Sequence, residues 1–189
     1  MGIDEDTRLA LLRLARTTID RRLRGRPDAD GSGVAAGILA GAFVTLKRDG
    51  ALRGCIGHIA ADQPLGEVVH RCALAAAFED PRFPPLAADE LAAVALEISV
   101  LSALHPTRPE DVVVGRDGLL LRADGRSGLL LPQVPVEHGW DRGAFLQHLC
   151  RKAGLKPDRW TAPGAELLRF TAVVFGESER QRRSEASLR

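Results

Sequence analysis

The 189-residue sequence has little of what several classes of protein require. It contains no tyrosine, one methionine and only 4% aromatic residues, so it is short of the side chains on which single-stranded nucleic acids stack. Its 26 basic and 25 acidic residues leave a net charge of +1. That charge is too small to draw the whole molecule onto nucleic acid or an anionic membrane. These shortages argue against a nucleic-acid-binding protein.

Long apolar runs and paired cysteines are missing as well. No run approaches the roughly 20 residues that span a bilayer, and the N-terminal segment lacks the cationic start of a secretion signal. Three cysteines, Cys55, Cys72 and Cys150, stand far apart, which fits a reducing compartment better than a disulfide framework. The histidines and cysteines lack the spacing of a metal site, and no nucleotide-binding motif occurs. We therefore expect a cytoplasmic protein without a membrane segment, metal or cofactor.

What is present predicts a folded α+β protein. Hydrophobic residues make up 45% and charged residues 27% of the chain, as in ordinary globular proteins. Apolar residues recur at helical spacing within residues 9–23, 65–76 and 145–153. Strand patterns cover residues 93–101, 111–115, 118–123, 128–134 and, as one closing strand, 166–175. Because helices and strands neither alternate strictly nor separate into blocks, we expect a mixed or mostly antiparallel sheet flanked by helices.

The segment AFVTLKRDGALRGCIGHI, residues 42–59, reads as a β-hairpin that turns at Asp49 and Gly50. A two-residue loop would mix polar and apolar side chains on both faces, because it pairs Lys47 with Leu52 and Leu46 with Arg53. A three-residue loop separates the two kinds, and we expect this one. Its pairs are Leu46 with Leu52, Val44 with Gly54, Thr45 with Arg53 and Phe43 with Cys55. One face then carries Val44, Leu46, Leu52 and Ile56, and the other carries Thr45, Arg53, Cys55 and Gly57.

Cys55 is the sharpest candidate for chemistry. Arg53 lies two residues earlier on the same strand face, and a guanidinium within reach of a thiol favours the nucleophilic thiolate. Gly54 and Gly57 would let a ligand approach the strand closely. The alternative is that the glycines accommodate a bulge or a packed helix and that Cys55 is a small buried hydrophobe. The residues leave both interpretations open.

Three further charged residues are candidates. Asp80 and Arg82 flank Pro81 in EDPRFPPL, where a stiff loop either aims an ion pair at a neighbouring site or is itself pinned by that pair. Glu97 lies on the polar side of its strand, either exposed or facing the same cleft as a base. Cys72 and Cys150 lie on apolar helical stripes and are expected in the core.

At FVTLKRDGALRGCIG the sequence resembles the AMMECR-type domain family, whose bacterial and archaeal members are called AmmeMemoRadiSam system protein A. Further segments of this chain look like the family in the same order, and the resemblance covers residues from about 6 to 177. These segments are AAAFEDPRFPPL, ELAAVALEISVLS, GLLLPQV, GWDRGAFLQHLCRKAGL and DRW. Members often carry Thr or Ser after GCIG, whereas this chain has His58.

The resemblance implies a single domain of two α+β lobes over residues 1–178, followed by a polar tail at 179–189. Its signature is LRGCIG, here Leu52–Gly57. Prokaryotic members are associated with a Memo-type protein and a radical SAM protein. A role in transcription, repair or translation has been suggested for eukaryotic members.

These observations give three hypotheses. The first is a thiol-dependent or acid–base enzyme that acts on a small substrate or modified residue at a cleft lined by LRGCIG. In it, Cys55, Arg53 and Glu97 perform the chemistry, and the substrate or partner is bound by Thr45, Gly54, Gly57, Asp80 and Arg82. The second is a non-enzymatic adapter for the Memo-type or radical SAM partner. The third, a nucleic-acid-associated factor, gains nothing from the neutral charge balance.

Overall fold

The computed structural model describes residues 2–177, which form two compact units. The first unit runs to Leu101 and resumes at Val173, and the second is Ser102–Ala172. Each unit contains a four-stranded antiparallel sheet with helices packed on it, so the predicted α+β class is confirmed. None of the described helices is both long and apolar enough to cross a membrane. The tail predicted at 179–189 lies outside the described residues.

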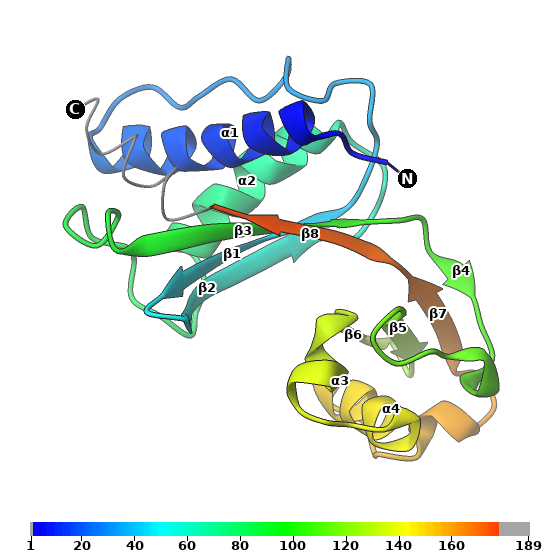
Figure 1. Cartoon of the computed structure of the whole chain (residues 1–189). Helices are drawn as coiled ribbons and strands as arrows, with labels where there is room; N and C mark the ends of the chain where they lie inside the picture. The colour runs from blue at the N-terminus through cyan, green and yellow to red at the C-terminus, as the bar shows by residue number, and fades with distance from the viewer. Residues whose placement is uncertain (1, 178–189) are drawn as a thin grey trace. The chain divides into compact units, whose positions relative to one another are not determined.

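The first unit packs two helices on one sheet. The sheet has the order β2-β1-β3-β8, and Figure 1 shows α1 and α2 together over one of its faces. The elements are α1 (Glu5–Leu23), β1 (Ala42–Arg48), β2 (Ala51–His58), α2 (Leu65–Phe78), β3 (Val94–Leu101) and β8 (Ala172–Gly176). The N-cap residue Asp4 starts α1 by accepting a hydrogen bond from the backbone N–H of Thr7.

The core of the first unit lies between the helices and the sheet. Its fully buried members include Leu11 and Ile19 of α1, Val68 and Val69 of α2, Val44 and Leu46 of β1, and Ile98 of β3. A buried ion pair joins Arg16 of α1 to Glu177, whose carboxylate also accepts a hydrogen bond from the backbone N–H of Leu96. This pair ties the end of β8 to α1 and β3.

The second unit is built around a sheet of order β4-β7-β5-β6. Asp141 accepts a hydrogen bond from the backbone N–H of Ala144 and so caps α4. The elements are β4 (His105–Pro106), β5 (Gly118–Ala123), β6 (Arg126–Leu130), α3 (Gln133–Glu137), α4 (Arg142–Lys152) and β7 (Glu166–Phe170), with 3-10 turns at Pro109–Asp111 and Arg159–Thr161.

Three predicted strands are wrong in whole or in part. Residues 111–115 contain no strand: Asp111 ends a 3-10 turn and residues 114–116 form a turn, because the carboxylate of Asp117 and the carbonyl of Val113 satisfy the local backbone. The strand predicted at 128–134 ends at Leu130, and the short α3 follows Pro132. The closing strand predicted at 166–175 is two strands, since the chain leaves the second sheet after Phe170 and enters the first as β8.

The hairpin register also differs from the predicted one. Asp49 and Gly50 form a two-residue loop with φ of 52° and 80°, the left-handed values that a tight hairpin turn requires. Lys47 pairs with Leu52, but Leu46 pairs with Gly54, because Arg53 is an extra residue in a β-bulge. The bulge restores the separation of polar and apolar faces that a plain two-residue loop would lose. Leu52 is 43% exposed, however, and does not join the apolar face.

Candidate functional site

Cys55 lies on β2, an edge strand of the first sheet, directly opposite Thr45 of β1. The Thr45 hydroxyl donates a hydrogen bond to the Cys55 sulfur over 3.3 Å. Thr45 is buried, whereas Cys55 is partly exposed. The structure therefore places a hydrogen-bonded and partly exposed thiol at the position where the sequence left open a nucleophile or a small buried residue.

The loop that follows α2 completes the sheet edge at Cys55. The backbone N–H of Cys55 donates to Oδ2 of Asp80 at 2.9 Å, and its carbonyl accepts from Nη2 of Arg82 at 3.1 Å. Edge strands carry unpaired N–H and C=O groups that invite a further strand. Asp80 and Arg82 satisfy both groups of this residue, and so they occupy one position of the open edge.

The predicted pairing of Asp80 and Arg82 is present. Nε and Nη2 of Arg82 donate to the two carboxylate oxygens over 2.9 and 2.7 Å. The Asp80 side chain is only 2% exposed, while Arg82 is half exposed. The hydrogen bonds from Arg82, helped by the Cys55 N–H, hold the pKa of Asp80 well below its usual range. The same contacts raise the pKa of Arg82, with smaller contributions from the Cys55 sulfur. Arg82 is thus a cation beside the thiol.

Arg53 has other partners than the sequence suggested. Its guanidinium donates to both carboxylate oxygens of Glu90, at 3.0 and 2.8 Å, and to the carbonyl of Pro84 at 3.0 Å. Among residues 2–177, no hydrogen bond joins it to the Cys55 sulfur. Because of the bulge, Arg53 does not share the strict alternation that would set it beside Cys55. The described hydrogen bonds of Arg53 therefore go to Glu90 and Pro84, and its influence on the thiol stays a prediction.

Glu90 is a member of this neighbourhood that the sequence did not reveal. The hydrogen bonds from Arg53, and then the backbone N–H of Ala87, lower the pKa of Glu90 to about 2. The ring of Phe83 lies near both arginines, with its centroid 5.9 Å from Cζ of Arg53 and 5.6 Å from Cζ of Arg82. Two carboxylate–guanidinium pairs thus flank one aromatic ring in the proline-rich loop.

Glu97 lies in the same row of side chains as Thr45 and Cys55. Thr45 is directly opposite Cys55 on one side and Glu97 of β3 on the other. Side chains of directly opposed residues project from the same face of a sheet, so Glu97 shares a face with Cys55, which was one of the two alternatives left open by the sequence. Nζ of Lys47 donates to Oε2 of Glu97 at 2.9 Å. Lys47 is a second member of the site that sequence reasoning missed.

The two glycines of the signature serve packing. A Cβ on Gly54 would lie 2.2 Å from the carbonyl oxygen of Ala76, so the backbone of α2 occupies that space. A Cβ on Gly57 would lie 2.3 Å from the ring of Phe43, which covers the glycine from the neighbouring strand. The packed helix, one of the alternatives left open by the sequence, accounts for Gly54. No ligand contact is needed to explain either residue.

The remaining cysteines and His58 stand apart from this row. Cys72 and Cys150 are buried, as predicted, and burial raises the pKa of the Cys72 thiol to about 11. Nε2 of His58 lies 2.7 Å from Oδ1 of Asp62 at the end of β2. Within residues 2–177, no cluster of three or more His, Cys, Asp or Glu side chains could hold a metal ion.

Comparison with known proteins places this arrangement in a family. The AMMECR1 family model matches residues 12–175, which include every residue of the site. The chain belongs to the AMMECR1 family. Among archaeal members, a protein of Thermococcus gammatolerans is 49% identical over 148 residues, 72% of each chain. Another, from Thermococcus onnurineus, is 42% identical over 181 residues, 88% of each chain.

The fold of AMMECR1 proteins is known from a crystal structure. The uncharacterized protein PH0010 from Pyrococcus horikoshii matches this chain with a TM-score of 0.88 and 38% identity, over 93% of this chain and 94% of that one. The names of these three proteins state no activity. The family therefore fixes the fold, and the chemistry of the site has to be argued from its residues.

Proposed function

We propose that this AMMECR1 protein uses Cys55 as a nucleophilic thiol toward a small electrophilic substrate or a modified residue. The hydrogen bond from the buried Thr45 hydroxyl to the partly exposed Cys55 sulfur is the observation that carries the proposal. Arg82 supplies the neighbouring cation that the sequence assigned to Arg53. Such a cation and hydroxyl favour the thiolate, which is the attacking form.

Glu97 is the acid–base group of the proposed site. Cys55 and Glu97 are separated by one intervening strand, which corresponds to about 10 Å between their backbones. The carboxylate is therefore too far from the sulfur to take its proton directly. It acts instead on a substrate that lies across Thr45 and reaches both side chains. Lys47, two residues along β1 from Thr45, forms an ion pair with this carboxylate.

Alkylation rates test the thiol. In the native full-length protein we expect iodoacetamide to label Cys55 and to spare the buried Cys72 and Cys150, as read by peptide mass spectrometry. Thr45→Val, which keeps the shape but removes the hydroxyl, should slow labelling of Cys55 about fivefold, since it removes a hydrogen bond to developing negative charge. Thr171→Val is the matched control on an exposed threonine. A native Cys55 that resists labelling, or equal rates in both variants, would contradict the proposal.

The family resemblance adds the setting of the proposed activity. We infer that the protein works in the cytoplasm with a Memo-type protein and a radical SAM protein. Its three free cysteines agree with a reducing compartment. In a reconstituted three-component reaction, Cys55→Ser should abolish product formation, and the buried-site variant Cys150→Ser should not. Full activity of Cys55→Ser would show that Cys55 is not a catalytic nucleophile.

An adapter function is the second candidate, and Leu52 favours it. This first residue of LRGCIG is 43% exposed, and the next residue, Arg53, donates a hydrogen bond to the carbonyl of Pro84 in a loop that contains three prolines. If the motif docks a protein, Leu52→Asp should abolish co-purification with both partners while leaving the labelling rate of Cys55 unchanged. Retained co-purification would reject this reading. The site offers few charges that could bind the phosphates of a nucleic acid, because carboxylates already pair with Arg53 and Arg82.

A further inference from the structure

One guanidinium nitrogen beside Cys55 has no acceptor in the protein. Nε and Nη2 of Arg82 donate to the carboxylate of Asp80, and Nη2 also donates to the Cys55 carbonyl. All three guanidinium nitrogens of Arg53, in contrast, donate to protein oxygens. Nη1 of Arg82 donates to none of the oxygens of residues 2–177. Because arginine is half exposed here and its N–H groups can only donate, this nitrogen is available to an acceptor from outside the chain.

The carboxylates of the two ion pairs have no such free atom. Asp80 is buried, and its two oxygens accept hydrogen bonds from Arg82 and from the backbone N–H of Cys55. Both oxygens of Glu90 accept hydrogen bonds as well, from Arg53 and from two further donors. The acceptors are thus occupied and covered, whereas the cation of the Asp80 pair is exposed. Positive charge on an accessible surface concentrates anions.

The free nitrogen lies close to the thiol. Nη2 of Arg82, which belongs to the same guanidinium, is 3.1 Å from the carbonyl oxygen of Cys55. Hydrogen bonds to Asp80 chiefly raise the pKa of Arg82, and the Cys55 sulfur contributes to the same shift. An anionic group on Nη1 would therefore bring the neighbouring carbon of its molecule toward the sulfur, which is the kind of positioning that accelerates a reaction between bound groups.

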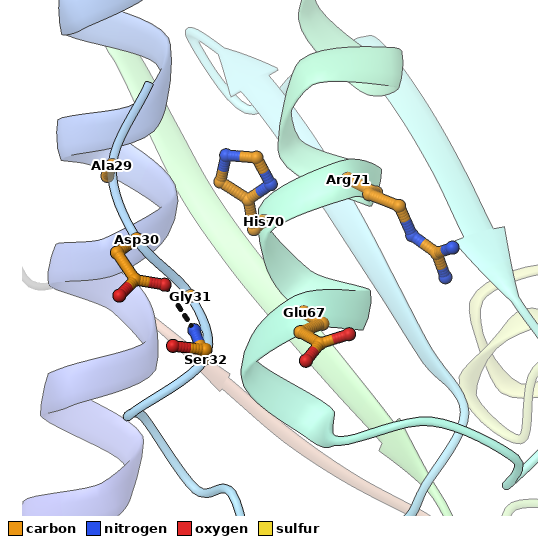
Figure 2. Close-up of a pocket in the computed structure, with 7 residues that line it drawn as sticks. All are labelled: Ala29, Asp30, Gly31, Ser32, Glu67, His70 and Arg71. Carbon is orange, nitrogen blue, oxygen red and sulfur yellow. Dashed lines mark hydrogen bonds between the residues drawn. The ribbon is translucent and has the colours of Figure 1, made fainter. Parts of the chain in front are cut away.

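A cavity elsewhere in the first unit has the opposite arrangement of charge. It encloses about 290 Å³ between α2 and the loop that follows α1. Figure 2 shows Asp30 and Glu67 in its lining, and both residues are exposed. These two carboxylates outnumber the one arginine of the lining, Arg71. An anion should avoid this cavity, which makes it an internal reference for the surface at Cys55.

We propose that Arg82 selects a carboxylate-bearing electrophile for Cys55, with the carboxylate on Nη1 and the reacting carbon beside the sulfur. This inference rests on the proposed function and names the substrate class of that site. The thiol gives its proton to water, the sulfur forms a bond to the carbon, and the leaving group departs with the electron pair of the bond that breaks. A single free nitrogen suits a monoanion better than a phosphate, which arginine frequently binds through two parallel hydrogen bonds.

Two alkylating reagents that differ chiefly in charge test this preference. Iodoacetate and iodoacetamide both alkylate sulfur with loss of iodide, and only iodoacetate carries a carboxylate. We expect the ratio of the iodoacetate rate to the iodoacetamide rate at Cys55, read by peptide mass spectrometry, to exceed the ratio for 2-mercaptoethanol about threefold, the size of an exposed charge interaction. In about 1 M sodium chloride the two ratios should become equal, because salt screens exposed charges.

Variants assign the preference to a residue. Arg82→Gln should lower the ratio at Cys55 to the value for 2-mercaptoethanol, and Arg82→Lys, which keeps the charge, should retain a raised ratio even if both reagents react more slowly. Arg8→Gln is the matched control, because Arg8 lies over Phe175 of β8, at the opposite edge of the sheet from β2. A change in the exposure of the thiol affects both reagents and cancels in the ratio.

Acetate, which cannot alkylate, tests the anion site without the thiol. In Cys55→Ser at constant ionic strength we expect saturable NMR shifts at the Nε–H of Arg82 and at the backbone amide of Phe83, and none at Gly31 and Ser32 of the cavity in Figure 2. Equal shifts at both places would reduce the effect to general anion binding and overturn the proposal.

The outcomes separate this inference from the function on which it rests. If neither reagent labels Cys55 while acetate binds at Arg82, the nucleophilic thiol is wrong and Arg82 remains an anion site. If both reagents label Cys55 at the ratio of 2-mercaptoethanol, or if Arg82→Gln keeps a raised ratio, the thiol remains and the selection by Arg82 is wrong. Absence of any acetate shift at Arg82 would overturn the selection as well.

Discussion

One edge strand of each sheet, β2 in the first and β6 in the second, has the same packing feature. Each carries a glycine at which the backbone of a helix crosses the strand. A Cβ on Gly54 would lie 2.2 Å from the carbonyl oxygen of Ala76 in α2, and one on Gly128 would lie 2.6 Å from the backbone nitrogen of Ala153 at the end of α4. Both units thus bring a helix closer to the sheet than any side chain would allow. Helix packing therefore explains Gly54 of LRGCIG, because the same packing occurs at Gly128 in a strand that contains no cysteine.

The difference between the strands lies beside the glycine. In β2 the next residue is Cys55, with a hydroxyl on its sulfur and a carboxylate–guanidinium pair on its backbone. In β6 the next residue is Leu129, which pairs with Leu120. The comparison separates what the motif needs in order to fold from what it offers for chemistry. Variants in the two units can test that separation.

Replacing the crossing glycines should have the largest effect. We expect Gly54→Ala to lower the free energy of unfolding by about 3 kcal/mol and Gly128→Ala by about 2 kcal/mol, because each methyl group would overlap helix backbone that cannot move aside easily. Gly33→Ala is the control, since nothing lies within 4 Å of its Cβ position; it should be neutral or slightly stabilising. Denaturant unfolding measures all three. A Gly54→Ala protein as stable as Gly33→Ala would break the comparison.

Two buried aspartates provide a matched pair with the next largest effect. Asp80 and Asp117 are each 2% exposed, each binds a nearby arginine, and each accepts a backbone N–H, from Cys55 and Val113 respectively. Asp80→Asn and Asp117→Asn should both cost about 2 kcal/mol, since each weakens charged hydrogen bonds to partly buried donors. Only Asp80→Asn should also change the labelling rate of Cys55. An equal change of the Cys55 labelling rate in Asp117→Asn would show that Asp80 has no specific influence on the thiol.

Unfolding in acid shows in which direction the ionisation of Asp80 and Glu90 changes the stability of the fold. The folded-state pKa values of Asp80 and Glu90 lie below their ordinary values of 3.8 and 4.5, with that of Glu90 at about 2. Groups with depressed pKa values stabilise the fold above their unfolded pKa and lose that contribution as the pH falls. Stability of the wild type should therefore decline as the pH falls from about 4.5 to 2. Asp80→Asn should flatten that decline, and a curve parallel to the wild type would contradict the assignment.

Much of the fold could be predicted because periodicity reports burial. The stripes of α1, α2 and α4 and the alternation of β3 follow from one face packing on a core. The closing segment misled the prediction because its strand pattern does not change at Thr171, where the chain passes from one sheet to the other. An alternating pattern shows which face is buried and not which sheet buries it. Residues 112–115 misled it because three valines favour a strand, whereas the Asp117 side chain stabilises a turn.

The sequence indicated several residues of the site but not which side chains pair with one another. Alternation correctly placed Thr45, Cys55 and Gly57 on one face, yet it assumed an unbroken ladder, and the bulge at Arg53 breaks it. Glu90 follows Arg53 by 37 residues, and no local pattern links two such positions. The spacing of Lys47 indicates only its place in the hairpin, because its partner Glu97 lies on another strand. Charge partners brought together by topology stay invisible to spacing arguments.

Arg53→Lys gives the smallest effect and the sharpest test of which arginine matters to the thiol. Lysine cannot reproduce the two parallel hydrogen bonds to Glu90, so we expect a loss of about 1 kcal/mol in unfolding free energy. The labelling rate of Cys55 should stay unchanged, because the Arg53 guanidinium is bound to Glu90 and Pro84. Arg82→Lys is its counterpart and should slow labelling, since Arg82 contacts the Cys55 carbonyl directly. If instead Arg53→Lys slowed labelling and Arg82→Lys did not, the bulge would not separate the guanidinium from the sulfur, and the pairing expected from the sequence would be right after all.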